Sequence, residues 1–303
     1  MKTIGMALGS GGARGLAHIG VLERLEELGI FPDLVAGSSM GSLVGFGYCG
    51  GRIAEMKALA LGMDIRTLLL RLVDFGMPHG GLVEGRRIEA LLEELMPRAT
   101  FRSLAKPLRC IATDLHSGEE VVFSEGHVVP AIRASISVPG LFAPVRHGHR
   151  YLIDGGVVNP IPVDQARRMG ADVVIAVDVN HGCLNRPRRR SLRRPVLKPP
   201  FSEWWKRIER EWNLQDSGRV RQLLAWFNED PSPNLVDVLG GTIHIVENQV
   251  SQVRLKLDPP DFLLTPAVGD AQILDFHHAR EIIAAGRASV DQQADALIKR
   301  CRR

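Results

Sequence analysis

Apolar and polar positions along the first 180 residues predict strands and helices in turn. Residues 3–8 form an apolar run typical of a buried strand, and apolar residues at helical spacing follow over 16–28 before Gly29 ends the helix. A second apolar strand is expected at 34–37, after Pro32. Two strands joined through a helix by short connections indicate a parallel pair.

The same alternation continues through the middle of the chain. Strands are predicted where apolar and β-branched residues gather between turn residues, and helices where apolar residues recur every three or four positions. The expected strands are 108–113, 120–124, 151–153 and 173–179, and the expected helices are 41–50, 53–61, 65–72 and 85–96. This order is typical of an α/β layered fold with a mainly parallel central sheet.

Beyond residue 180 the pattern changes. Residues 182–200 are rich in Arg and Pro, which predicts an exposed or disordered loop, and helical spacing resumes at 201–212, 218–227 and 235–257. We predict one domain over 1–303. Its parts are a core at 3–180, a basic loop at 182–200, a helical insertion at 201–257, and a closing strand at 261–265 with a helix at 275–300.

Composition narrows the class of protein. The chain has 303 residues, 45% hydrophobic and 24% charged, as expected for a soluble globular protein. Its net charge of +4 is local, since six arginines lie within Arg186–Arg194 and the rest of the chain carries 32 − 34 = −2. A nucleic-acid-binding face is therefore disfavoured. Binding of this short arginine-rich patch to an anionic surface or ligand stays an alternative.

Other sequence features point to the cytoplasm. Four cysteines lie far apart without paired spacing, so we expect reduced thiols and no metal site. The N-terminus lacks the apolar core and cleavage site of a signal peptide. The uncharged run at 34–51 is half Gly and Ser, which makes a membrane span a poor interpretation.

The most informative motif is Gly37-Ser38-Ser39-Met40-Gly41, between a predicted strand and an uncharged helix. A GxSxG sequence in that context is typical of a nucleophile elbow, because the glycines permit a sharp turn and the helix N-terminus lends positive potential. Ser39 is therefore a candidate nucleophile. The alternative is an ordinary Gly/Ser helix cap.

A glycine loop, residues 9–15 (GSGGARG), joins the first strand to the first helix. Amides in such a loop bind an anion, either a phosphate or the oxyanion of acyl transfer. A dinucleotide site is disfavoured because Arg14 takes the last glycine position of GxGxxG and no acid follows the second strand. A P-loop is disfavoured because no Gly-Lys-Ser/Thr follows. As an oxyanion hole, the loop would border the same crevice as Ser39.

A nucleophilic serine needs a base, and a histidine is one option. An α/β-hydrolase would place it last in the chain order, but several strands should then precede the elbow, and only one strand-helix-strand step precedes Ser39. That fold is disfavoured. The available histidines are His181, His244, His277 and His278, of which the last two are more typical of solvated or capping positions.

Asp154 is the better candidate base. It follows the predicted strand 151–153 and precedes Gly155 and Gly156, which let a hydroxyl approach closely. Its ordinary pKa near 3.9 would have to rise through burial for efficient proton abstraction. A simple Asp-Gly-Gly turn is the alternative role, and Asp114 is the rival carboxylate.

These three motifs, in this order, resemble those of the patatin-like phospholipases. The resemblance covers about residues 3–180 and includes the stretches 17–21, 112–115, 134–140 and 159–162. The stretches 258–261 and 274–277 resemble the bacterial RssA-type branch. The resemblance implies a three-layer α/β fold with a mainly parallel central sheet and a C-terminal helical insertion.

The resemblance also implies residue roles. Ser39 would be the nucleophile and Asp154 its base, in a dyad without histidine. The oxyanion hole would be formed by Gly11, Gly12, Ala13 and Arg14, and the motifs would be completed by Ser10, Gly15, Gly37, Gly41, Gly155 and Gly156. The first glycine of the family's GGGxR/KG pattern is Ser10 here, which bears on catalytic efficiency more than on the fold.

The implied activity is hydrolysis of lipid carboxylic esters through an acyl-Ser39 intermediate, without cofactor or metal. A weakly active or non-catalytic regulatory or scaffold protein at the membrane surface is the alternative. All four tryptophans lie between residues 204 and 226, in helical stripes. The Arg186–Arg194 loop and the Trp204–Phe227 helices could bind an anionic inner membrane surface, or these helices could pack on the body or on another subunit.

Overall fold

The computed structural model describes residues 2–62, 81–183 and 235–301. The predicted helices at 65–72, 201–212 and 218–227, and most of the predicted basic loop, lie outside the described residues. The chain divides into two compact units, one formed by 1–184 with 240–303 and the other by 185–239. Ser39 and Asp154 both lie in the first unit.

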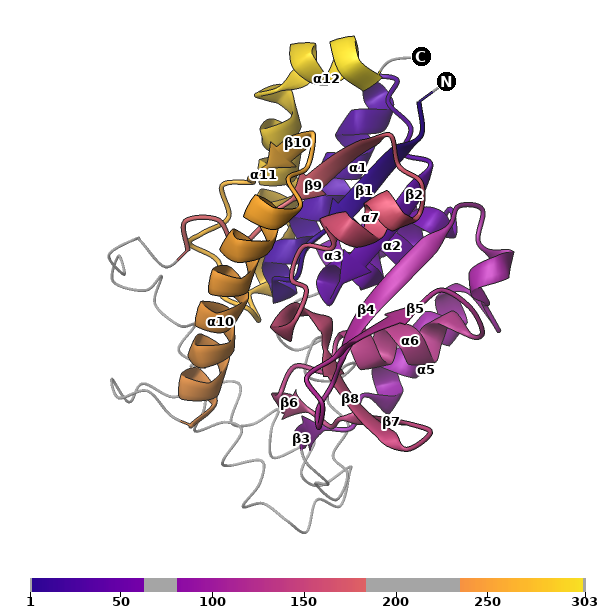
Figure 1. Ribbon diagram of the computed structural model, residues 1–303, viewed down its shortest axis with the longest axis vertical. Coiled ribbons are helices and arrows are strands. Elements are labelled where there is room, and N and C mark those ends of the chain that lie inside the picture. Colours follow the sequence, from indigo (N-terminus) through magenta and orange to yellow (C-terminus); the bar gives the residue numbers. More distant parts are fainter. Residues whose placement is uncertain (1, 63–80, 184–234, 302–303) are drawn as a thin grey trace. The chain divides into compact units, whose positions relative to one another are not determined.

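The core of this unit is an eight-stranded sheet (Figure 1). Five neighbouring strands run parallel, and antiparallel strands complete one side, so the predicted mainly parallel sheet is confirmed. The parallel strands are, in spatial order, β10 (Phe262–Leu264), β9 (Val173–Val177), β1 (Ile4–Leu8), β2 (Leu34–Ser38) and β4 (Leu108–Asp114). The antiparallel strands are β5 (Glu120–Phe123), β8 (Arg150–Asp154) and β7 (Val145–His147). A separate pair joins β3 (Gly81–Val83) to β6 (Gly140–Phe142).

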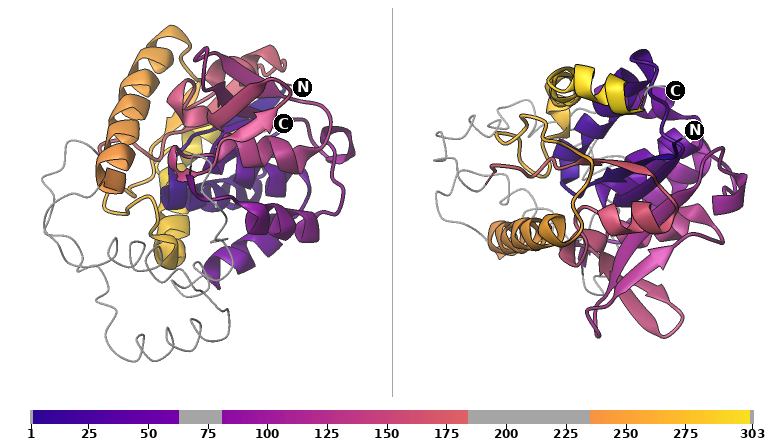
Figure 2. Two further views of the ribbon diagram at one scale, coloured as in Figure 1. Left: turned by 90° about the horizontal axis from the view of Figure 1, so that it is seen from below. Right: turned by 45° about the horizontal axis from the view of Figure 1, so that its top comes forward.

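Helices cover both faces of the sheet, which confirms the three-layer fold (Figures 1 and 2). In β1, Ile4, Met6 and Leu8 point to the larger hydrophobic cluster, and Ala7 points to the smaller one on the other face. The larger cluster includes α1 (Ala17–Glu27), α2 (Met40–Cys49), α6 (Val128–Ser135) and α11 (Ala279–Asp291). The smaller cluster lies under α7 (Val163–Arg168) and includes Leu255 of α10 (Leu235–Leu257).

The remaining helices complete the periphery. They are α3 (Ile53–Leu61), α5 (Arg86–Leu95) and α12 (Ala294–Cys301), with short 3-10 turns η1 (Gly12–Leu16), η2 (Phe101–Ser103), η3 (Gly155–Val157) and η4 (Phe276–His278). The closing helix expected at 275–300 is divided into η4, α11 and α12. None of the helices within the described ranges has the length and apolarity needed to cross a bilayer.

The registers along β4 bring two distant strands end to end. Cys110 of β4 pairs with both β2 and β5, and Ala112 pairs with both β5 and β8, so β2 and β8 lie on the same side of β4. β2 runs parallel to β4 and ends opposite Ile111, whereas β8 runs antiparallel and ends opposite Ala112. Because the two strands approach from opposite directions, their carboxyl ends meet at adjacent positions of β4.

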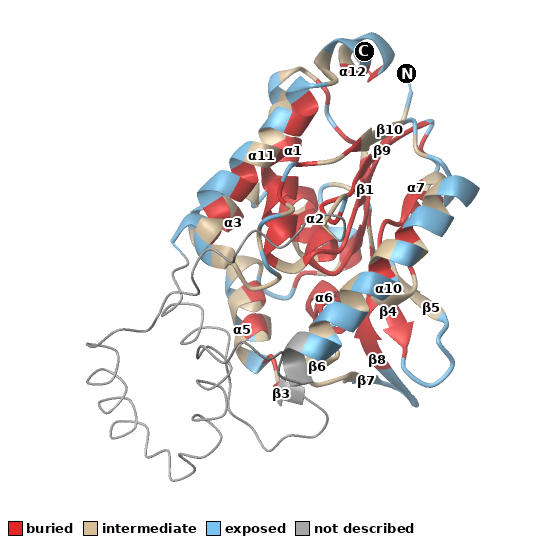
Figure 3. Ribbon diagram, turned by 90° about the vertical axis from the view of Figure 1, so that its left-hand side faces the viewer, coloured by how far each residue is buried: buried red, intermediate tan, exposed pale blue. Residues whose placement is uncertain are grey.

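Helix α10 has its polar side turned towards the protein. Glu247 and Ser251 on this side are buried, and Arg254 lies 3.7 Å from Asp164 of α7. The outer side of α10 is largely exposed (Figure 3), and it carries apolar residues among polar ones, with Val253 57% exposed.

Candidate active site

Ser39 occupies a sharp turn between β2 and α2. Its backbone has φ 53° and ψ −122°, a conformation that is uncommon for a residue with a side chain. A Cβ at Gly41 would lie 2.0 Å from the Leu8 carbonyl oxygen, and one at Gly37 would lie 2.5 Å from the Gly41 backbone. The two glycines are thus required by close backbone approach, and the predicted strand-turn-helix elbow is present.

The Ser39 hydroxyl lies in contact with Asp154, 115 positions later in the chain. Its Oγ donates to the Asp154 Oδ2 at 2.5 Å, and the amide of Gly156 donates to the Oδ1 at 2.7 Å. A Cβ at Gly155 would lie 2.2 Å from the Ile111 carbonyl oxygen, so only glycine allows the chain to pass β4 at the strand junction. The meeting of β2 and β8 therefore places hydroxyl and carboxylate together.

Asp154 has the chemical character of a base. The residue is 1% exposed, and its burial raises the pKa to about 7, against the lowering effect of the hydrogen bonds from Ser39 and Gly156. A carboxylate with a pKa near neutrality is a far better proton acceptor than an exposed one, yet it remains ionised in part at pH 7. The rise that efficient catalysis would require is therefore present.

The glycine loop packs against the elbow. A Cβ at Gly15 would lie 2.4 Å from the Met40 side chain. The Ala13 amide donates to the Ile273 carbonyl at 2.9 Å, so it is already engaged. Within the part of the chain that the structure describes, the amides of Gly11 and Gly12 have no such acceptor. Gly11 and Gly12 are therefore two predicted oxyanion-hole residues whose amides are available.

Two buried side chains hold this loop in place. His18 donates from Nε2 to the Gly9 carbonyl at 2.8 Å, and burial lowers its pKa to about 4, so the ring is neutral. Arg14 donates from Nε to the Gly11 carbonyl at 3.3 Å. Both hydrogen bonds are accepted by carbonyl oxygens of the loop, so they orient the loop and do not occupy its amide N–H groups.

The alternative bases lie elsewhere or have other partners. Asp114 ends β4 and accepts the amide of His116, and this hydrogen bond lowers its pKa. His181 lies 3.9 Å from Asp178, and His278 lies 3.9 Å from Glu281, whereas the Ser39 hydroxyl is hydrogen-bonded to Asp154. His277 is exposed. His244 of α10 approaches the site, but its ring nitrogens face the Arg14 guanidinium at 3.4 Å.

Three residues of the site had no assigned role in the sequence analysis. The Ser135 hydroxyl, at the end of α6, accepts the Ser39 amide at 3.0 Å and also contacts Ser42 at 2.8 Å. Glu247 and Asn180 approach the glycine loop from α10 and from the end of β9. The one sequence feature that pointed to Ser135 is its place in the stretch 134–140, which resembles the family. No local sequence pattern indicated a role for Glu247.

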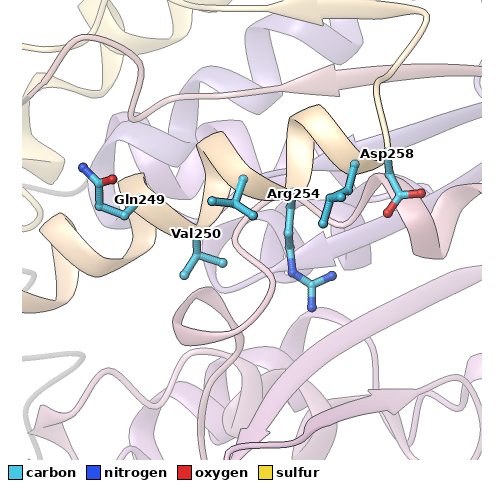
Figure 4. Close-up of a pocket in the computed structure, with 6 residues that line it drawn as sticks. Gln249, Val250, Arg254 and Asp258 are labelled. Carbon is cyan, nitrogen blue, oxygen red and sulfur yellow. The ribbon is translucent and has the colours of Figure 1, made fainter.

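The described residues do not show the pattern of a metal site. Nowhere in residues 2–62, 81–183 and 235–301 do three His, Cys, Asp or Glu side chains gather as metal ligands would. All four cysteines are free thiols. A cavity of about 520 Å³ lies along α10, where Val250 and Arg254 point to the same side of the helix (Figure 4). Neither Ser39 nor Asp154 lines it.

Comparison with known proteins identifies the family. Residues 6–167, which hold the glycine loop, the elbow and Asp154, match the family model of the patatin-like phospholipases. The chain belongs to the patatin-like phospholipase family. It is 31% identical to an uncharacterized NTE family protein of Mycobacterium bovis over 97% of this chain and 92% of that protein. The RssA-type branch stays a prediction.

Two further proteins are similar to this chain. Patatin-like phospholipase domain-containing protein 6 of Mus musculus is 35% identical over 59% of this chain and 14% of that protein. The solved structure of VipD from Legionella pneumophila superposes with a TM-score of 0.54, covering 98% of this chain and 67% of that one. At 13% sequence identity, this last similarity concerns the fold alone.

Proposed function

We propose that this protein hydrolyses carboxylic esters of lipids, with Ser39 as nucleophile and Asp154 as its base. The observation that carries the proposal is the hydrogen bond of 2.5 Å between the Ser39 Oγ and a buried carboxylate, beside two glycine amides without an acceptor among the described residues. Family membership supports a lipid as the substrate.

This geometry supports the following proposed reaction. Asp154 takes the Ser39 proton on its Oδ2 while the Oγ bonds to the ester carbon, and the Gly11 and Gly12 amides stabilise the resulting oxyanion. Collapse of the tetrahedral intermediate breaks the ester C–O bond, and the leaving alcohol takes the proton from Asp154. Water then attacks acyl-Ser39 with Asp154 again as base, which releases the acid and returns a proton to Ser39.

The test combines covalent labelling with turnover. A fluorophosphonate should label the native protein and not Ser39→Ala, and a panel of phospholipids, lysophospholipids and simple esters should be cleaved only by the protein that labels. Ser38→Ala is the matched control, because this buried neighbour has no hydrogen-bond partner for its hydroxyl among the described residues. A folded native protein that neither labels nor cleaves any ester would refute the proposal.

That negative outcome would favour the second candidate, a regulatory or scaffold protein that keeps the fold and has little activity. The observation that supports it is Ser10, where the family pattern has glycine. The Ser10 side chain is buried beside the glycine loop, and its hydroxyl makes no regular hydrogen bond within the described residues. Replacing Ser10 with glycine should then raise esterase activity.

We also propose that the protein acts at an anionic inner membrane surface. The Arg186–Arg194 and Trp204–Phe227 segments on which this prediction rests lie outside the described residues. Among the described residues, support comes from helix α10. Its Val253 and Leu257 are 57% and 73% exposed, next to the exposed Lys256. Vesicles containing phosphatidylglycerol should co-sediment with the protein at low salt, and less so at high salt.

The vesicle experiment has a matched variant pair. Val253→Gln with Leu257→Gln should reduce co-sedimentation several-fold, whereas Phe31→Gln, at a site 53% exposed outside α10, should not. Equal binding by both variants would remove α10 from the membrane contact.

A further inference from the structure

Helix α10 places a second carboxyl group inside the candidate active site. Glu247 is 7% exposed, and the Asn180 Nδ2 donates to its Oε2 at 3.4 Å. A Cβ built on Gly156 would lie 2.1 Å from the Glu247 Oε1 and 2.9 Å from the Ser10 Oγ. Gly156 is the residue whose amide binds Asp154, so Glu247 lies beside the dyad and the glycine loop together.

The two buried carboxyl groups cannot both be ionised at low cost. Like charges in a buried site repel strongly, and a pair of this kind keeps one proton well above the ordinary pKa of a carboxyl group. The pKa of Glu247 rises to about 8, first through burial and then through the Asp154 charge, while Arg14 opposes the rise. The pair therefore holds one proton near neutral pH.

Hydrogen bonding decides which group carries that proton. Asp154 receives two short hydrogen bonds, from the Ser39 hydroxyl at 2.5 Å and from the Gly156 amide at 2.7 Å. Among the described residues, Glu247 receives a longer hydrogen bond of 3.4 Å from Asn180, and the Ser10 hydroxyl lies close to it without regular hydrogen-bond geometry. Donors favour the ionised form of the group they reach, so the negative charge belongs on Asp154.

The other titratable groups around Glu247 do not move the proton from Glu247 to Asp154. Arg14, from the glycine loop, is the cation whose charge acts on Glu247. His244, one turn earlier on α10, is neutral, since burial and the Arg14 charge lower its pKa to about 4. Asp178, at the end of β9, has a pKa raised by burial, and it accepts the Asn180 amide.

We propose that Glu247 is a positioning residue that stays protonated beside the dyad, so that Asp154 is the ionised base and no negative charge opposes the oxyanion. This inference rests on the proposed function. When Glu247 loses its proton, its charge lies beside Ser10 of the glycine loop and beside Gly156, where it counteracts the stabilisation that the loop amides give to the tetrahedral intermediate. Activity should then fall on the alkaline side because of Glu247, and on the acid side because of Asp154.

Glu247→Gln tests this directly, because glutamine keeps the shape of the neutral acid and cannot ionise. The fluorophosphonate labelling rate of Ser39 is measured between pH 5 and pH 10. The native protein should show a bell-shaped profile, falling about tenfold for each pH unit above the alkaline midpoint. The variant should keep the acid limb and lose the alkaline one. Asp258→Asn, at an exposed carboxylate that adjoins the end of α10, should keep both limbs.

A second measurement does not depend on activity or on the folding of a variant. Infrared spectra of protein carrying ¹³C-labelled glutamate should show the carbonyl band of a protonated carboxyl at pH 7, and this band should vanish at pH 10. An alkaline limb that persists in Glu247→Gln, or the absence of the band at pH 7, overturns the inference. Native protein that never labels refutes the proposed function instead, while the band still decides the state of Glu247.

Discussion

Replacing Asp154 with asparagine separates a catalytic carboxylate from a structural one. Asparagine can accept the Gly156 amide with its oxygen and donate to the Ser39 Oγ with its nitrogen, so both positions that now hold hydrogen bonds stay occupied. The side-chain volume hardly changes. We therefore expect a folded protein that has lost its base, with the turnover rate reduced by about 10²–10⁴-fold.

The same change should increase stability at neutral pH. The Asp154 pKa is about 7 in the folded protein and 3.8 for the unperturbed group, a difference of about 3 units. At about 1.4 kcal/mol per unit, the burial of the charged form costs at most about 4 kcal/mol, and relaxation around the charge makes about 1–4 kcal/mol the expected range.

The sign follows from proton binding. Between pH 3.8 and about 7, the folded state holds the proton of Asp154 and the unfolded state has released it, so the native protein loses stability as the pH rises. Asparagine does not titrate. The stability advantage of Asp154→Asn should therefore be small near pH 4, grow up to pH 7, and stay constant above.

Denaturant unfolding at pH 4, 6 and 8 measures this advantage, and fluorophosphonate labelling measures the activity. The comparison is repeated in the Glu247→Gln background, because Glu247 interacts with Asp154. Asp114→Asn is a control for which we expect the opposite change in the free energy of unfolding. The pKa of Asp114 is lowered, so its charge stabilises the fold above its unfolded pKa, and its loss should weaken the fold at neutral pH without affecting labelling. Full turnover in Asp154→Asn, or a loss of stability independent of pH, would refute the reasoning.

Two other substitutions test the elbow. Gly41→Ala should destabilise the fold by about 3 kcal/mol in thermal unfolding, because its Cβ would lie 2.0 Å from a backbone oxygen. Gly241→Ala, where a Cβ meets nothing within 4 Å in α10, should be neutral or stabilise by up to about 1 kcal/mol, and equal losses would disprove the steric account. Ser135→Ala removes the acceptor of the Ser39 amide, which should cost about 1–3 kcal/mol and slow labelling. Unchanged labelling and stability would show that Ser135 does not support the elbow.

Secondary-structure elements and short motifs of this protein could be recognised from the amino-acid sequence. Strands β1, β2, β4, β5, β8 and β9 and helices α1, α2, α3 and α5 could be predicted, because they depend on the spacing of apolar residues and on Gly and Pro at the turns. Helices α6 and α7, which pack on the two faces of the sheet, were not predicted. The turn at Ser39 could be predicted as well, since a helix that begins directly after a strand needs glycine where the backbones nearly touch. Asp154 was recognisable by its two following glycines.

The tertiary structure alone decided how these parts meet. Ser39 and Asp154 come together because β2 and β8 end at adjacent positions of β4, and this register depends on the packing of the whole sheet. The sequence predicted a helix at 235–257 but not which of its residues are buried; Glu247 and Ser251 of α10 are buried, and Arg14, Asn180 and Asp164 offer polar partners on that side. The elevated pKa of Asp154 and the presence of Glu247 follow from burial and proximity, which arise only when residues far apart in the chain are packed together.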